Sequence, residues 1–171
     1  MDEETEKRDE FIYELIADRF RLEWQRTNDL DGKASRIVRF VGIIVSLQAG
    51  LGSLLLKEMP RTCGFYFYPL LCFIFLSGLG FLMCSILCGL KAYGVKTWSV
   101  VPDTEHLIEE YAKKDKSRID ILRLVSAEIS AAVAKNAATN DEKVEFIRQG
   151  FIFFVLGIGV AILFVCGLLL V

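Results

Sequence analysis

The sequence predicts an all-α integral membrane protein in which three transmembrane helices carry long cytoplasmic helical extensions that form a bundle. Of its 171 residues 53% are hydrophobic, above the roughly 45–50% of soluble domains, and the mean hydropathy is +0.41. Three stretches, residues 40–56, 69–90 and 151–171, contain no Asp, Glu, Lys, Arg or His. Because a helix needs about 20 apolar residues to cross a bilayer, each stretch is a candidate span.

Composition also excludes several classes of protein. A net charge of −2 and a pI near 5.5 give no field that attracts nucleic acid, and we expect no nucleic-acid partner. The single histidine, His106, stands alone among charged residues at a predicted helix start, and four of the five cysteines lie in the apolar stretches, so no set of metal ligands can be identified. The sequence therefore predicts no metal, no cofactor and no enzymatic activity.

The amino-terminal half is predicted to be one charged helix followed by the first span. Residues 1–36 form a cytoplasmic amphipathic helix whose stripe has three- and four-residue spacing. Transmembrane helix 1 follows at 37–56; a re-entrant segment is the alternative, because this uncharged run is short and contains polar residues. The stripe consists of Ile12, Ile16, Phe20, Trp24, Thr27, Asp31, Ala34 and Val38.

The rest of the chain is predicted to contain two further spans. A short extracytoplasmic loop, 57–68, leads to transmembrane helix 2 at 69–91, where Pro69 suits a first helical turn. A cytoplasmic linker and helix occupy 92–118, and a cytoplasmic helix at 119–150 continues into transmembrane helix 3 at 151–171. A seam with alternating spacing, typical of coiled coils, runs along that helix. Its members are Ile119, Leu122, Val125, Ile129, Val133, Asn136, Asn140, Val144 and Ile147.

Positive charges predict the orientation. Residues 1–36 carry seven Lys or Arg and residues 91–150 carry ten, whereas the loop between the first two spans has only Lys57 and Arg61. Since cytoplasmic segments are enriched in these residues, we expect a multi-pass membrane protein with a defined orientation. Its amino terminus is then cytoplasmic and its carboxyl terminus extracytoplasmic.

Small residues recur within the spans and predict close helix packing, because helices in lipid associate through small-residue contacts and hydrogen bonds. The sharper alternative is that one such stripe lines a narrow conduit. The predicted helix-packing residues are Gly42, Gly50, Ser85, Gly89, Gly159 and Gly167.

Gln48 is the most informative residue within the spans. A carboxamide near the middle of a bilayer needs a partner or water. Partners within the chain would be Ser46, Ser53, Ser77 or Ser85; otherwise the need is met by Gln48 of neighbouring subunits or by a water-filled pore. The pore-lining candidates are accordingly Gln48, Ser46 and Ser53.

Three polar residues are predicted to meet at the cytoplasmic ends of the spans. Asp31 and Lys143 precede the uncharged parts of the first and third spans by about the same number of residues, and Asn140 lies one turn before Lys143. We therefore expect a cytoplasmic polar cluster of Asp31, Asn140 and Lys143 that sets the register of the bundle. The alternative is that each faces water separately.

The overall layout resembles small prokaryotic membrane proteins of the SLATT and Pycsar transmembrane-effector type. The resemblance rests on residues 31–35 (DGKAS), on residues 107–111 (LIEEY), and on Asn136, Asn140 and Lys143. It implies an oligomeric pore in the plasma (inner) membrane of a prokaryote. The families that the chain resembles are associated with nucleotide-signalled antiviral defence. SLATT proteins typically have two spans, whereas this chain has a third, and it has no recognisable cyclic-nucleotide sensor domain.

These observations favour an oligomeric membrane channel or pore-forming protein that conducts ions. Its expected partners are the lipid bilayer, further copies of the chain in a homo-oligomer, and ions. The alternative is a non-conducting membrane scaffold or anchor whose cytoplasmic helices bind a protein partner.

Overall fold

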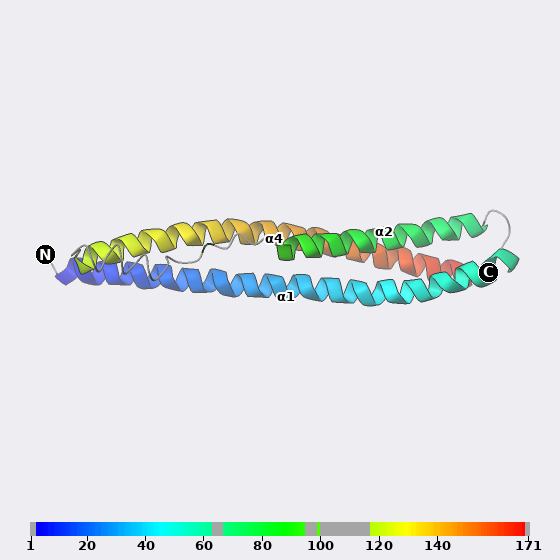
Figure 1. Ribbon diagram of the computed structural model, residues 1–171, viewed down its shortest axis with the longest axis horizontal. Helices are drawn as coiled ribbons and strands as arrows, with labels where there is room; N and C mark the ends of the chain where they lie inside the picture. Colours follow the sequence, from blue (N-terminus) through cyan, green and yellow to red (C-terminus); the bar gives the residue numbers. More distant parts are fainter. Residues whose placement is uncertain (1–2, 63–66, 95–98, 100–116, 170–171) are drawn as a thin grey trace. The chain divides into compact units, whose positions relative to one another are not determined.

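The residues that the structure describes form three helices, drawn in Figure 1. A computed structural model describes the backbone of residues 3–62, 67–94, 99 and 117–169, and in the first helix it describes the side chains of residues 4–53. The helices are α1 (Glu3–Thr62), α2 (Phe67–Gly94) and α4 (Arg118–Leu169). The predicted all-α class is confirmed for these residues, and all three helices are long and apolar enough to cross a membrane.

The helix boundaries differ from the expected ones around the second span. The predicted loop 57–68 is helical at 57–62, where α1 continues through Pro60, and at 67–68, where α2 has begun. Helix α2 also extends to Gly94, beyond the expected end at 91. Helix α4 begins at Arg118, one residue before the expected start, and has no break before Leu169, as the sequence predicts. Most of the predicted linker and helix 92–118, and residues 63–66 of the predicted loop, lie outside the described residues.

The chain divides into two compact units. Unit 1 comprises Met1–Asp29 and Lys96–Glu142, and unit 2 comprises Leu30–Val95 and Lys143–Val171. Helices α1 and α4 contribute residues to both units, whereas α2 belongs to unit 2 alone. Almost all charged residues of the described chain are therefore in unit 1 or in the first turns that α1 and α4 contribute to unit 2.

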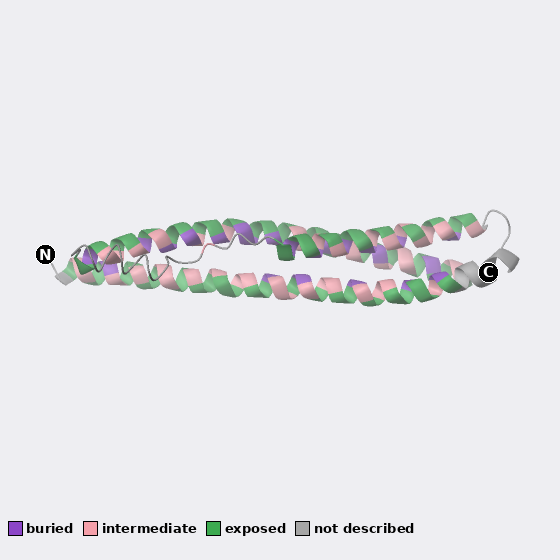
Figure 2. Ribbon diagram, in the orientation of Figure 1, coloured by how far each residue is buried: buried purple, intermediate pink, exposed green. Residues whose placement is uncertain are grey.

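In unit 1, α1 and α4 pair in parallel. Glu6 bonds to Arg118, Asp9 to Arg123 and Glu23 to Asn140, so positions advance together along both helices. The buried positions of α4 lie on one seam with the 3.5-residue repeat of coiled coils, visible as recurring buried residues in Figure 2. Those in unit 1 include Ile119, Ser126, Ile129, Asn136 and Asn140.

The predicted stripe of α1 is partly wrong. Ile12 and Trp24 are 40% and 49% exposed, while Asp9 is buried at 6% exposed. The reason is the period: Asp9 belongs to a seam that advances by seven residues per two turns, through 16, 23 and 30, and Ile12 and Trp24 fall beside that seam.

In unit 2, α2 runs antiparallel to α1 and α4 and packs against both (Figure 1). Its apolar core contains Leu71 of α2 and Phe164 of α4, and the Phe164 ring lies 5.2 Å from that of Phe75. The outside of the unit is apolar too, with Phe73 and Leu163 each more than 60% exposed. Helices that are apolar on every side are typical of a lipid environment.

Candidate functional site

The side chain of Gln48 lies inside unit 2 without a hydrogen-bond partner. It is only 2% exposed, and neither its Nε2 nor its Oε1 has a partner among the residues that the structure describes. A Cβ added to Gly78 of α2 would lie 3.2 Å from the Gln48 Nε2 and 3.2 Å from Val160 Cγ1 of α4. The carboxamide therefore points into the space where all three helices meet.

The serines expected to satisfy Gln48 bond elsewhere. Three of them donate to carbonyl oxygens of their own helix: Ser46 to Gly42, Ser53 to Gly50 and Ser77 to Phe73, at 2.7–3.0 Å. Ser85 donates across the unit to the Gly150 carbonyl at 2.7 Å. Each buried polar atom left without a partner costs about 1–3 kcal/mol, so the arrangement around Gln48 is energetically unfavourable as it stands.

The three predicted pore-lining residues do not share a face. Ser46 and Ser53 are exposed on the outside of unit 2, whereas Gln48 is buried. Two residues along an α-helix correspond to a rotation of about 200°, which places Gln48 opposite Ser46. Lining by all three residues would therefore need two different faces of α1.

The predicted packing residues also divide into two groups. Ser85, Gly89 and Gly167 lie at helix contacts: a Cβ on Gly89 would be 2.7 Å from Val38, and one on Gly167 would be 2.7 Å from Leu71. By contrast, a Cβ on Gly42, Gly50 or Gly159 would meet no atom within 4 Å. These last three glycines face outward and do not support contacts within this chain.

Further close contacts occur at glycines that spacing alone did not single out, namely Gly52, Gly78, Gly150 and Gly157. At Gly157 a Cβ would lie 2.7 Å from the side chain of Leu82, and at Gly150 it would lie 3.4 Å from a backbone oxygen. The seam predicted from the sequence passes through Val144 and Ile147 and misses both positions. The buried seam of α4 passes instead through Lys143, Gly150 and Gly157.

The structure brings together two members of the predicted polar cluster. Lys143 Nζ donates to Asp31 Oδ1 at 2.7 Å in unit 2, and the lysine side chain is only 5% exposed. Asn140 belongs to unit 1, where its Nδ2 donates to Glu23 Oε2 at 2.8 Å and its Oδ1 accepts from the Thr27 hydroxyl at 2.9 Å. Glu23 and Thr27, absent from the predicted cluster, are therefore the partners of Asn140.

Unit 1 contains further polar contacts that the sequence did not reveal. Asn136 is fully buried and bonds to both backbone groups of Ser99: its Oδ1 accepts from the Ser99 amide at 2.9 Å, and its Nδ2 donates to the Ser99 carbonyl at 3.1 Å. Arg26 donates to Asp141 at 2.7 Å, and this hydrogen bond, with Glu23 nearby, raises the pKa of the guanidinium. Hydrogen bonds between residues so far apart in the sequence can be predicted only when the register between the two helices is known.

No known protein family, curated protein or solved structure matches this chain. Among the described residues no group of three His, Cys, Asp or Glu side chains could hold a metal ion. The unusual chemistry of the described chain is therefore the unsatisfied carboxamide of Gln48, which can bind water or a cation through its oxygen but has no group beside it that could act as a base or nucleophile.

Proposed function

We propose that the protein is an oligomeric membrane channel that conducts ions. The proposal is supported by three helices long and apolar enough to cross a bilayer, and by an outer surface of unit 2 that is apolar. Three helices packed around a side-chain core leave no room for a conduit within one chain, so the conduit would form between several copies.

The unpartnered carboxamide of Gln48 is the observation that carries this proposal. In the packed arrangement it is kept from water at a cost of some kcal/mol, since two polar atoms lack partners. If α1 rotated about its axis and brought Gln48 into a hydrated conduit, water would supply the missing partners and remove that cost. The packed arrangement would then be the closed state, and hydration of Gln48 would favour the open one.

The outward face of α1 fits the contact between copies. Gly42, Ser46, Gly50 and Ser53 lie on one side of the helix, where the serine hydroxyls already bond to their own backbone. A second helix could approach closely along this side, because small residues allow backbones to come near each other.

Substitution of Gln48 tests the proposal through ion flux from liposomes that contain the purified protein. Gln48→Leu removes the unsatisfied atoms and stabilises the packed arrangement, so flux should fall. Gln48→Glu places a carboxyl group in the same position. Raising the pH ionises this group, and because a buried carboxylate is costly, the packed closed arrangement is destabilised. Flux should therefore rise as the pH is raised.

Ser77→Ala is the matched control, since its hydroxyl bonds within its own helix on the surface of the unit and its loss should leave flux unchanged. Equal flux from the wild type, Gln48→Leu and Gln48→Glu would exclude Gln48 from any conducting pathway. The assignment as a channel would then lose its main support.

A membrane scaffold is the second candidate function, favoured by an exposed apolar stripe on α1 in unit 1. Phe11, Leu15 and Leu22 are 54–65% exposed and lie within about 40° of one another around the helix. Such a stripe outside the apolar unit suits a partner helix. A monomeric mass together with the absence of flux would favour this function over the channel.

A further inference from the structure

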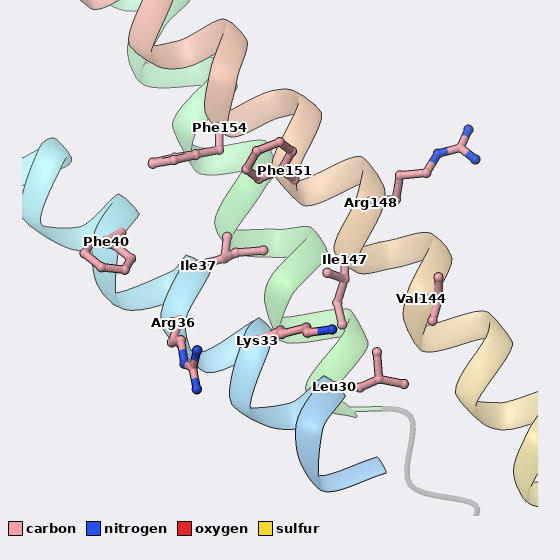
Figure 3. A pocket seen from close by; sticks show the side chains of 10 residues that line it. All are labelled: Leu30, Lys33, Arg36, Ile37, Phe40, Val144, Ile147, Arg148, Phe151 and Phe154. Atoms are coloured by element: carbon pink, nitrogen blue, oxygen red, sulfur yellow. The ribbon is translucent and has the colours of Figure 1, made fainter. Parts of the chain in front are cut away.

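A groove between α1 and α4 in unit 2 combines cationic and apolar side chains (Figure 3). Its volume is about 700 Å³, within the roughly 300–1,000 Å³ of small-molecule sites. Because the two helices run in parallel, the lining residues early in both segments lie at one end and the later ones at the other. Lys33 belongs to the first end, Arg36 and Arg148 lie near the middle, and Phe40, Phe151 and Phe154 belong to the second end.

Among the residues that the structure describes, Lys33 and Arg36 form no salt bridge. Asp31, two residues before Lys33 on α1, is bonded to Lys143 instead. Arg148 is 71% exposed and lies 3.7 Å from Glu145, which is itself half exposed, so this contact is weak. Figure 3 shows Arg36 and Arg148 extending outward on different sides of the groove.

The second end is apolar and open. Phe40 and Phe151 are 59% and 56% exposed, and Phe154 lies beside Phe151 in Figure 3. The groove spans the point in both helices where charged residues stop: Arg39 is the last charge before the first uncharged stretch, and Arg148 the last before the third. If the apolar stretches lie in lipid, this is the level of the headgroups.

We propose that the groove binds an anionic phospholipid. The phosphate would be held by Lys33, whose side chain reaches across the groove in Figure 3, while Arg36 and Arg148 would attract the anion from the two rims. One acyl chain would lie along the phenyl rings. Basic pockets between membrane helices bind anionic headgroups in this way. The groove has cations beside an apolar end, which suits a lipid with a charged headgroup and an acyl chain. A free phosphate ion would occupy only the cationic part and leave the end with the phenyl rings empty. This site does not involve Gln48 and is independent of whether the chain conducts.

Native mass spectrometry of the purified full-length protein with phosphatidylglycerol or phosphatidylcholine tests the proposal. The wild type should retain phosphatidylglycerol and not phosphatidylcholine, and soluble glycerol phosphate should not compete. Replacing Lys33, Arg36 and Arg148 together by Gln should weaken retention about fivefold for each charge removed. The control replaces Arg19, Arg21 and Lys135, three exposed cations of unit 1, and should retain the lipid.

Val144→Trp adds a bulky ring to the groove without altering its charge, and should also displace the lipid, which keeps the test informative should the triple variant fail to fold. Equal retention of the two lipids, or equal losses in the triple variant and its control, would overturn the proposal. Cross-linking of Val144→Cys to a second copy in the presence of phosphatidylglycerol would overturn it too, because the groove would then hold protein.

Discussion

Lys143 is a buried charged residue with one ion-pair partner among the residues that the structure describes. Its side chain is 5% exposed, while that of Asp31, which accepts its hydrogen bond, is 33% exposed. Removing one partner of a buried ion pair leaves the other charge without compensation. Since only the carboxylate can reach water, the two possible losses are unequal.

Asp31→Ala should therefore destabilise the protein more than Lys143→Met. The first change leaves a buried ammonium and should cost about 3–5 kcal/mol, whereas the second leaves a carboxylate that solvent can reach. Denaturant titrations in detergent, followed by helical circular dichroism, measure both losses. The exchanged pair Asp31→Lys with Lys143→Asp should recover part of the loss; a double variant no better than the worse single one would contradict the pairing.

Glycines two residues apart on α4 offer a second comparison between single residues. Gly157→Ala brings a methyl group within 2.7 Å of Leu82, and overpacking of this kind costs about 1–3 kcal/mol. Gly159→Ala meets no atom within 4 Å and is its matched control, since both changes improve helix propensity equally. Thermal denaturation should show a lower midpoint for Gly157→Ala only; equal midpoints would place Gly157 outside the helix contact.

The pairing of α1 with α4 depends on polar residues within an otherwise apolar seam. Asn136 and Asn140 are both fully buried. The side chain of Asn136 bonds to the Ser99 backbone, and that of Asn140 bonds to Glu23. A buried amide in a seam fixes register at a cost in stability, because only one alignment supplies its partners. Asn140 thereby fixes α4 against α1, and Asn136 fixes the chain at Ser99.

Asn136→Leu should release the Ser99 backbone while leaving α1 and α4 paired. Its expected signature is faster hydrogen exchange at the Ser99 amide, since that group loses its acceptor. Asn140→Leu is the control, because its partners are Glu23 and Thr27 and the Ser99 amide should be unaffected. Unchanged exchange at Ser99 in the Asn136 variant would show that another group satisfies the amide.

At this scale the sequence predicted the helices well and their contacts less well. Apolar length and the absence of internal breaks were enough to indicate three helices, and α4 is continuous as its uninterrupted pattern suggests. Hydrophobicity, however, placed Val144 on the seam, and Val144 is 39% exposed while Lys143 beside it is buried. In a helix that is apolar on every side, hydrophobicity does not distinguish the residues that face neighbouring helices from those that face lipid. The contacting side is identified by glycine contacts and polar pairs, which only the structure shows.

The parallel course of α1 and α4 predicts on which side of a membrane the amino-terminal ends of these two helices lie. Glu6 and Arg118, near the starts of the two helices, bond to each other in unit 1. If the apolar stretches of both helices cross a bilayer, these starts must lie on the same side of it, and the positive charges of unit 1 favour the cytoplasm.

Labelling with a membrane-impermeant maleimide checks this arrangement in intact cells and in inverted vesicles. With the other native cysteines replaced, Thr5→Cys and Ser117→Cys should both react only in inverted vesicles, whereas native Cys63 should react in intact cells. Opposite accessibility of positions 5 and 117 would contradict the parallel pairing together with the proposed topology.

The contacts of the inward glycines have a consequence for evolution. A side chain that faces lipid can drift among Leu, Ile, Val and Phe with little penalty, so overall similarity between distant relatives fades quickly. Positions 78, 89, 150, 157 and 167 are more constrained, since a Cβ at each would lie 2.7–3.3 Å from a neighbouring helix and would require that neighbour to shift. Their spacing is a fingerprint by which a divergent homologue could be recognised after most of its hydrophobic residues had changed.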